Sequence, residues 1–100
     1  NGQLWRKGTY KDGETEGPWV WYHRNGQLKR KGTYKNGETE GPWVSYWDNG
    51  QLSWKGTFKS DKIEGPWVFY KKDGTKDMDG KSEDWHDGTG TYRNGKKVSD

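Results

Sequence analysis

The sequence predicts an all-β fold, an elongated and twisted antiparallel meander of stacked β-hairpins. Three observations predict it: a tandem repeat of 24 residues, turn-forming dipeptides on both sides of each β-rich run, and apolar content that is mainly aromatic. The chain of 100 residues carries 16 Gly and 8 Trp, and its glycines and its β-branched and aromatic runs disfavour helix. We expect about seven or eight strands, two in each repeat.

The repeat divides the chain into four segments. Residues 1–24, 25–48 and 49–72 are three copies of the repeat, and the first two are nearly identical. Residues 73–100 contain a degenerate fourth copy and what we expect to be an irregular, polar C-terminal cap, because the ends of repeat arrays need a polar outer face. We treat the four segments as one repeat domain.

Asn-Gly dipeptides recur at the start of each copy. Asn25-Gly26 and Asn49-Gly50 are typical of two-residue type I′ hairpin turns, in which both residues have positive φ. Such a turn pairs Trp19 with Gly32 and His23 with Leu28. Leu28 then lies on the same face as the tryptophans.

The same register places each repeated Trp opposite a glycine of the next copy, where we expect its indole to cover backbone that has no side chain. The degenerate copy supplies Gly80 for the last of these pairs. The residues with this expected structural role are Trp19, Trp43 and Trp67, with Gly32, Gly56 and Gly80 opposite them.

The second turn of each repeat, at Asp12-Gly13 in the first copy, creates a conflict of hydrogen-bond direction. If both turns were tight, Val20 would have to bond to both neighbouring strands, so we expect that this second turn is not a simple two-residue turn. We also expect a break in the ladder at Gly17-Pro18, since Pro has no N–H and Gly tolerates a bulge. The prolines assigned to this structural role are Pro18, Pro42 and Pro66.

The strand face opposite the repeated tryptophans carries tyrosines and valines among lysines, and it gives the candidate binding residues. They are Tyr22, Tyr46, Tyr70, Lys31 and Lys55, together with Trp5. Such a surface could stack on a ligand or attract anionic lipid headgroups. The alternative is that lysine stems cover the tyrosines and the repeated glutamates Glu14, Glu16, Glu38 and Glu40 neutralise the lysines.

Charge and residue inventory exclude several function classes. The net charge of +3 is spread along the chain, which argues against a nucleic-acid binder. There is no Cys, and His23 and His86 have no repeated ligand partners, so we expect no metal site, no cofactor and no enzymatic activity. A calcium loop within 73–87 is a weaker alternative to an acidic solvated loop: Asp77, Asp79 and Gly80 have the loop spacing, but Thr75 would hold the first ligand position and His86 the last, where a bidentate Glu is needed. No apolar run resembles a signal peptide or membrane span, so we expect a soluble chain from which a leader before Asn1 could have been removed.

The spacing Gly8-x-Tyr10-x-x-Gly13-x-x-x-Gly17-x-Trp19-x-x-Tyr22, repeated from Gly32 to Tyr46, resembles the variant MORN repeat. The chain is most similar to bacterial tandem-repeat proteins that are often labelled as antitoxin components of toxin–antitoxin pairs. The resemblance covers residues 1–72 and part of the tail "GTYRNGKKVSD"; Phe58, Asp61 and the polar stretch 75–89 depart from it. It implies a non-catalytic stack of hairpins that binds or scaffolds proteins, with self-association as the alternative and anionic lipid or glycan as a weaker one.

Overall fold

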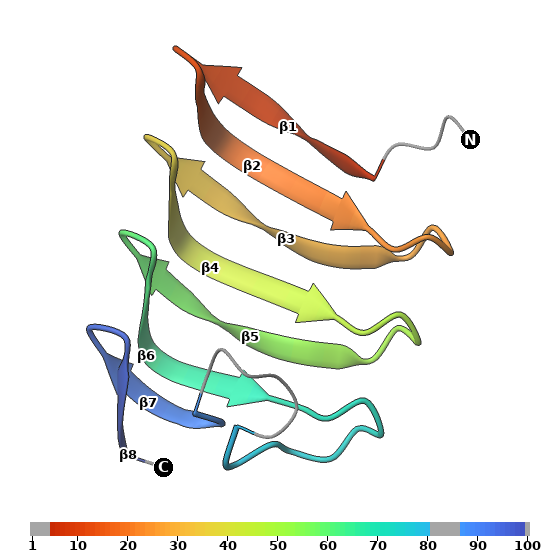
Figure 1. Ribbon diagram of the computed structural model, residues 1–100, viewed down its shortest axis with the longest axis vertical. Coiled ribbons are helices and arrows are strands. Elements are labelled where there is room, and N and C mark those ends of the chain that lie inside the picture. The colour runs from red at the N-terminus through yellow and green to blue at the C-terminus, as the bar shows by residue number, and fades with distance from the viewer. Residues whose placement is uncertain (1–4, 81–86, 100) are drawn as a thin grey trace.

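The computed structural model describes residues 5–80 and 87–99. It confirms the all-β prediction. Eight antiparallel strands form one open sheet in the order of the sequence, and Figure 1 shows them following one another down the molecule, each hairpin beside the next. The strands are β1 (Arg6–Lys11), β2 (Glu14–Tyr22), β3 (Leu28–Lys35), β4 (Glu38–Tyr46), β5 (Leu52–Lys59), β6 (Lys62–Phe69), β7 (Gly90–Arg93) and β8 (Lys96–Ser99).

The turn between β1 and β2 is the tight turn of the repeat, contrary to our expectation. Lys11 pairs with Glu14 across two residues, and these residues, Asp12 and Gly13, have φ of 52° and 82°. Positive φ at both positions is the signature of a type I′ turn. The equivalent turns have the same pattern, and in the third copy Ser60 and Asp61 adopt φ of 49° and 70° without any glycine.

The turn at Asn25-Gly26 is longer than we predicted. Only Gly26 has positive φ, at 87°. The Gly26 N–H donates to the His23 carbonyl at 2.9 Å and the His23 N–H donates to the Gln27 carbonyl at 2.8 Å, so three residues form the loop. Tyr22 therefore pairs with Leu28. A β-bulge separates this pair from the next one, which is Trp21 with Arg30. The predicted pairing of His23 with Leu28 was wrong, and Leu28 lies on the face opposite the tryptophans.

The predicted break at Gly17-Pro18 is confirmed. Thr9 pairs with Glu16 while Lys7 pairs with Val20, so β2 has extra residues between two paired stretches. Gly17 has φ of 76° within this bulge, a conformation in which glycine has no steric penalty. The bulge resolves the conflict of hydrogen-bond direction and bends each long strand.

Each repeated tryptophan pairs with a glycine on one side and covers another glycine on the other side. Trp19 pairs with Gly32, as predicted. Its indole, however, lies over Gly8 of the preceding strand, where an added Cβ would be only 2.0 Å from Cδ2 of Trp19. Trp43 covers Gly32 in the same way. The expectation that the indole covers the glycine of the following copy was therefore wrong in direction.

The last pair also differs from the prediction. Trp67 pairs with Gly90 at the start of β7 and not with Gly80. The chain between β6 and β7 is an insertion into the repeat, so continuing the 24-residue step selected the wrong glycine. The tail "GTYRNG", which contains Gly90, supplies the missing strand and tight turn as the hairpin β7–β8 within the region that we expected to be irregular.

Successive repeats are joined by hydrogen bonds between their tight turns. The Glu16 carboxylate accepts the Asn36 N–H at 2.9 Å, and the Thr15 carbonyl accepts the Gly37 N–H at 3.0 Å. Because the turn N–H groups point along the stack, each repeat caps the next one. The later carboxylate contacts are Ser60 N–H to Glu40 at 3.0 Å and Asn94 N–H to Glu64 at 2.9 Å.

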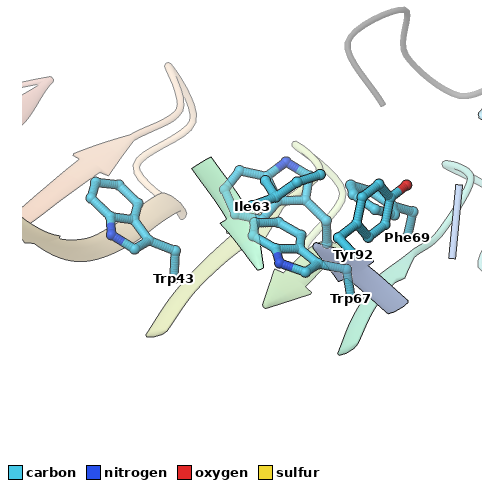
Figure 2. Packing of buried hydrophobic residues seen from close by; sticks show 6 residues of the cluster. Trp43, Ile63, Trp67, Phe69 and Tyr92 are labelled. Carbon is cyan, nitrogen blue, oxygen red and sulfur yellow. The ribbon is translucent and has the colours of Figure 1, made fainter. Parts of the chain in front are cut away.

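The core is a row of aromatic rings on one face of the sheet, which we call the aromatic face. It contains Trp19, Trp21, Tyr34, Trp43, Trp54, Phe58, Ile63, Trp67, Phe69 and Tyr92. Burial increases toward the C-terminal half, where Trp67, Phe69 and Tyr92 are at most 2% exposed. Figure 2 shows Ile63 beside Trp67, with Phe69 and Tyr92 on one side and Trp43 standing apart on the other. The indole N–H groups of the repeated tryptophans donate to backbone carbonyls, as Trp43 Nε1 does to the Thr33 carbonyl at 3.1 Å.

Candidate functional site

The face opposite the aromatic core contains a groove that is repeated along the sheet. Along β2, Trp19 and Trp21 point to the aromatic face, so Pro18 and Val20 point to the other face, since side chains alternate along a strand. The same alternation repeats in β4 and β6. We call this surface the proline face. It comprises Pro18, Pro42, Pro66, Val20, Val44, Val68, Thr33, Thr57, Lys31, Lys55, Tyr46 and Leu52.

The groove on the proline face has a volume of about 1080 Å³ and crosses the strands from β2 to β6. Its prolines and lysines are exposed, while its valines are half-buried between them. The valines pair with lysines of the neighbouring strands, Val20 with Lys31 and Val44 with Lys55. The result is an apolar floor with a lysine beside each central valine.

Leucine contributes to this groove because of the bulge after the Asn-Gly turn. Leu52 pairs with Tyr46, and both line the groove. The simple alternation of the sequence assigned leucine to the aromatic core, and for that reason sequence reasoning missed Leu52 as a groove residue.

Three of the candidate binding residues lie together here: Lys31, Lys55 and Tyr46 line the groove. Tyr22 and Tyr70 occupy the equivalent positions of the outer copies and are half-buried, but they do not line it. Trp5 lies just before β1 and is 38% exposed. Its carbonyl accepts the Tyr22 N–H at 2.7 Å, which ties this residue to the edge of the sheet and away from the groove.

The groove lysines keep their positive charges available. Within residues 5–80 and 87–99 the ion pair is between Lys72 and Asp48, at 3.0 Å, and neither Lys31 nor Lys55 takes part in one. Two of the four glutamates that we expected to neutralise them have another role, since Glu16 and Glu40 accept hydrogen bonds from turn N–H groups. None of the four, all of which are among the described residues, forms an ion pair with Lys31 or Lys55. An anionic ligand over the groove would therefore find two cations without carboxylate partners.

In the described part of the insertion between β6 and β7, the buried carboxylate is that of Asp77. Asp77 is fully buried, and its carboxylate accepts the Gly80 N–H at 3.0 Å. Among the described residues no three His, Cys, Asp or Glu side chains are grouped closely enough to hold a metal ion. His86, a proposed calcium ligand, lies outside the described residues.

Sequence comparison identifies the hairpin unit. Residues 15–36 and 39–60 match the MORN repeat variant family. These two segments are similar to the variant MORN repeat. Each matched MORN segment begins after a tight turn and ends in the next one, so it spans β2 and β3 or β4 and β5. This confirms the resemblance seen in the sequence.

MORN repeats are generally non-enzymatic modules for binding or scaffolding, and they commonly mediate interactions with proteins or membrane lipids. No curated protein matches this chain. The part of the chain that the structure describes has no helix with the length and apolar content that a membrane span requires.

Proposed function

We propose that this chain is a non-catalytic interaction module whose proline face binds an extended, acidic and apolar segment of a partner protein. The observation that carries the proposal is the groove itself, an apolar floor flanked by Lys31 and Lys55 without carboxylate partners. Apolar contact supplies affinity in such a site, and the charges select and orient the ligand.

The spacing of the lysines indicates the kind of segment. Lys31 and Lys55 lie on β3 and β5, which are two strands apart in the sheet. Two strand spacings correspond to about 10 Å, and a polyproline II segment advances about 3.1 Å per residue with three residues per turn. Two acidic side chains three residues apart in that conformation would face the two lysines, and the residues between them would lie over Val44.

Self-association, the alternative from the sequence, has one feature against it. The free edge strand β1 is exposed along its whole length and carries Arg6, Lys7 and Lys11. The last strand, β8, carries Lys96 and Lys97. Edge-to-edge pairing of these two strands would bring like charges together, and cationic edges are one of the ways in which natural sheets avoid such pairing.

The test is a screen of displayed random peptides against the chain and against a Lys31→Glu/Lys55→Glu double variant. We expect enriched peptides with acidic residues three positions apart, and roughly tenfold weaker binding to the double variant in titration calorimetry, since exposed ion pairs contribute about 0.2–1 kcal/mol each. Lys96→Glu is the matched control, because Lys96 is exposed but lies outside the groove.

Enriched peptides that bind the double variant and the parent chain equally would refute the proposal. So would a screen without enrichment. In parallel, flotation with phosphatidylserine vesicles, a glycan array and light scattering at high concentration assess the other partner classes. If the parent chain binds vesicles or glycans, or associates with itself, and the double variant does not, the groove is a site for that other class of partner.

A further inference from the structure

The aromatic face holds one cation among its rings. Arg30, on β3, lies between Trp21 of β2 and Trp54 of β5, with its Cζ atom 5.8 Å and 5.7 Å from the two ring centroids. Both distances are within the range of cation–π attraction. Arg30 pairs with Ser45 across the strands, and this small buried side chain stands where the other copies have Trp21 and Phe69. The guanidinium therefore has room that a large ring would fill.

Arg30 has no anionic partner. Its Nε atom is buried and makes no hydrogen bond, and the residue forms no ion pair within the part of the chain that the structure describes. A half-buried charge without a counter-ion is costly unless something else compensates it. The two indole faces compensate for part of that cost, and they leave the net positive charge in place.

A hollow of about 570 Å³ lies beside this cation, a volume within the range of small-molecule sites. Aromatic and aliphatic side chains form much of its lining: Tyr34, Trp43, Trp54, Phe58 and Ile63. Burial raises the pKa of Tyr34, and the nearby Arg30 charge opposes that rise. The hydroxyl of Tyr34 therefore stays neutral at physiological pH and leaves the Arg30 charge uncompensated.

The one carboxylate at the rim is engaged elsewhere. Asp61 lines the hollow, but its Oδ1 accepts the Thr39 N–H at 2.6 Å and the Thr39 hydroxyl at 2.8 Å. Lys62, next to it, adds a second positive charge to the rim. The side chains around the hollow therefore offer more positive than negative charge to a ligand.

The hollow is also where the repeat is broken. The repeat position of Arg30 is occupied by Arg6 in the first copy and by Trp54 in the third. The position that pairs with it across the strands is occupied by Trp21, Ser45 and Phe69 in the three copies. The groove on the proline face, in contrast, repeats Pro, Val and Lys in all three copies. Repeat geometry alone thus accounts for the groove but not for the arrangement around Arg30.

We propose that this hollow binds a carboxylate carried on a flat apolar group. The carboxylate pairs with Arg30, and the ring lies among the aromatic side chains of the lining. An aromatic ring with one carboxylate matches the planar donor fork of arginine and the shape of an aromatic-lined site. The ligand is either a free aromatic acid or the C-terminal carboxylate of a peptide that ends in an aromatic residue. This site is on the opposite face of the sheet from the proposed protein groove, and Trp43 contributes to both.

The test titrates the chain with two acids and their uncharged amides, using NMR of the indole and arginine Nε–H groups together with calorimetry. The probes are benzoate against benzamide, and acetyl-Gly-Phe with a free carboxylate against the same peptide amidated. We expect saturable binding of at least one acid, weakened about tenfold or more in the matching amide, because a hydrogen bond to a charged group contributes about 1.5–3 kcal/mol. The acid that binds more tightly identifies the kind of ligand: benzoate indicates a free aromatic acid, and acetyl-Gly-Phe indicates the C-terminus of a peptide.

Two variants link the binding to the site. Arg30→Gln should weaken binding of the acid about tenfold or more. Arg6→Gln, which removes the same charge at the equivalent position of the first copy, should leave it unchanged. Thermal unfolding shows whether Arg30→Gln is folded. If Arg30→Gln is not folded, the rim variant Lys62→Gln takes its place, and it should weaken binding of the acid but not binding of the amide.

Three results would overturn the proposal. The first is that neither acid binds at concentrations up to about 10 mM, the weakest affinity expected for so small a ligand. The second is that acid and amide bind equally. The third is that a folded Arg30→Gln variant binds the acid as tightly as Arg6→Gln does.

Discussion

Replacing Gly32 with Ala tests how the repeated tryptophans hold the sheet together. A Cβ at this position would be 1.9 Å from Cδ2 and 2.2 Å from Cε2 of Trp43. The backbone at Gly32 does not have the positive φ that requires glycine, so Ala on its own should stabilise the strand by roughly 0.5–1 kcal/mol. Any destabilisation must therefore come from displacing the indole.

The magnitude follows from what Trp43 loses when it moves. It is 3% exposed, its Nε1 donates to the Thr33 carbonyl at 3.1 Å, and its ring meets Tyr34 edge-on at 5.2 Å. The hydrogen bond and the ring pair contribute about 1 kcal/mol each, and overpacking costs a further 1–3 kcal/mol by the usual order of magnitude. We expect a net loss of about 3 kcal/mol.

For a domain of about this size, each kcal/mol shifts Tm by roughly 4–8 °C, so Gly32→Ala should lower Tm by roughly 12–24 °C. Circular dichroism during thermal unfolding, with urea unfolding followed by fluorescence, measures the effect. The matched control is a double-mutant cycle with Trp43→Ala. Once the indole is gone, Gly32→Ala should no longer destabilise the chain and should instead stabilise it by roughly 0.5–1 kcal/mol. An unchanged Tm in the single variant, or an equal loss in both backgrounds, would refute this account of the packing.

Two further predictions concern backbone strain and ionisation. Gly41 has φ of 81°, and a Cβ added there would have no neighbouring atom within 4 Å. Gly41→Ala should therefore cost only the strain of a left-handed conformation, about 1–2 kcal/mol in urea unfolding; a loss as large as that of Gly32→Ala would contradict this reasoning. Burial raises the pKa of Tyr92 above its ordinary value of 10.0. Because the folded-state pKa is the higher one, its contribution to stability is complete below about pH 10 and is lost as the pH rises through the folded-state pKa. The Tyr92 hydroxyl donates to the Gly88 carbonyl, so the Tyr92→Phe variant should be less stable than the parent at pH 8. The variant should, however, lose less stability than the parent between about pH 9 and pH 11. Parallel curves of stability against pH for the two chains would exclude this explanation.

Much of the fold could be predicted from local rules. The repeat and the alternation of side chains gave the antiparallel meander, the pairing of Trp19 with Gly32 and the break at Gly17-Pro18. These features depend on residues within one or two strands of each other. Of the candidate site, Lys31, Lys55 and Tyr46 could be placed on one face by alternation alone, and they lie together in the groove.

The turns could not be assigned correctly in this way. Asn25-Gly26 has the stronger hairpin sequence, yet Asp12-Gly13 forms the tight turn. Asn25 is held in the longer loop because its Oδ1 accepts the Gln27 N–H at 2.9 Å and its Nδ2 donates to the Asp48 carbonyl of the next repeat at 2.8 Å. The second of these contacts exists only when repeats stack, so propensity within one hairpin does not reveal it.

The sequence by itself determined that this protein is a stack of hairpins with tryptophans opposite glycines, because a period of two along each strand and a period of 24 along the chain are local and visible. The tertiary structure decided which glycine each indole covers, that Leu52 lies in the groove, and that Arg30 lies between two tryptophans beside a hollow. Trp21 and Trp54 are separated by more than one repeat in the chain. Their meeting around Arg30 depends on the bulges and bends that bring β2, β3 and β5 together, and no local pattern encodes that geometry.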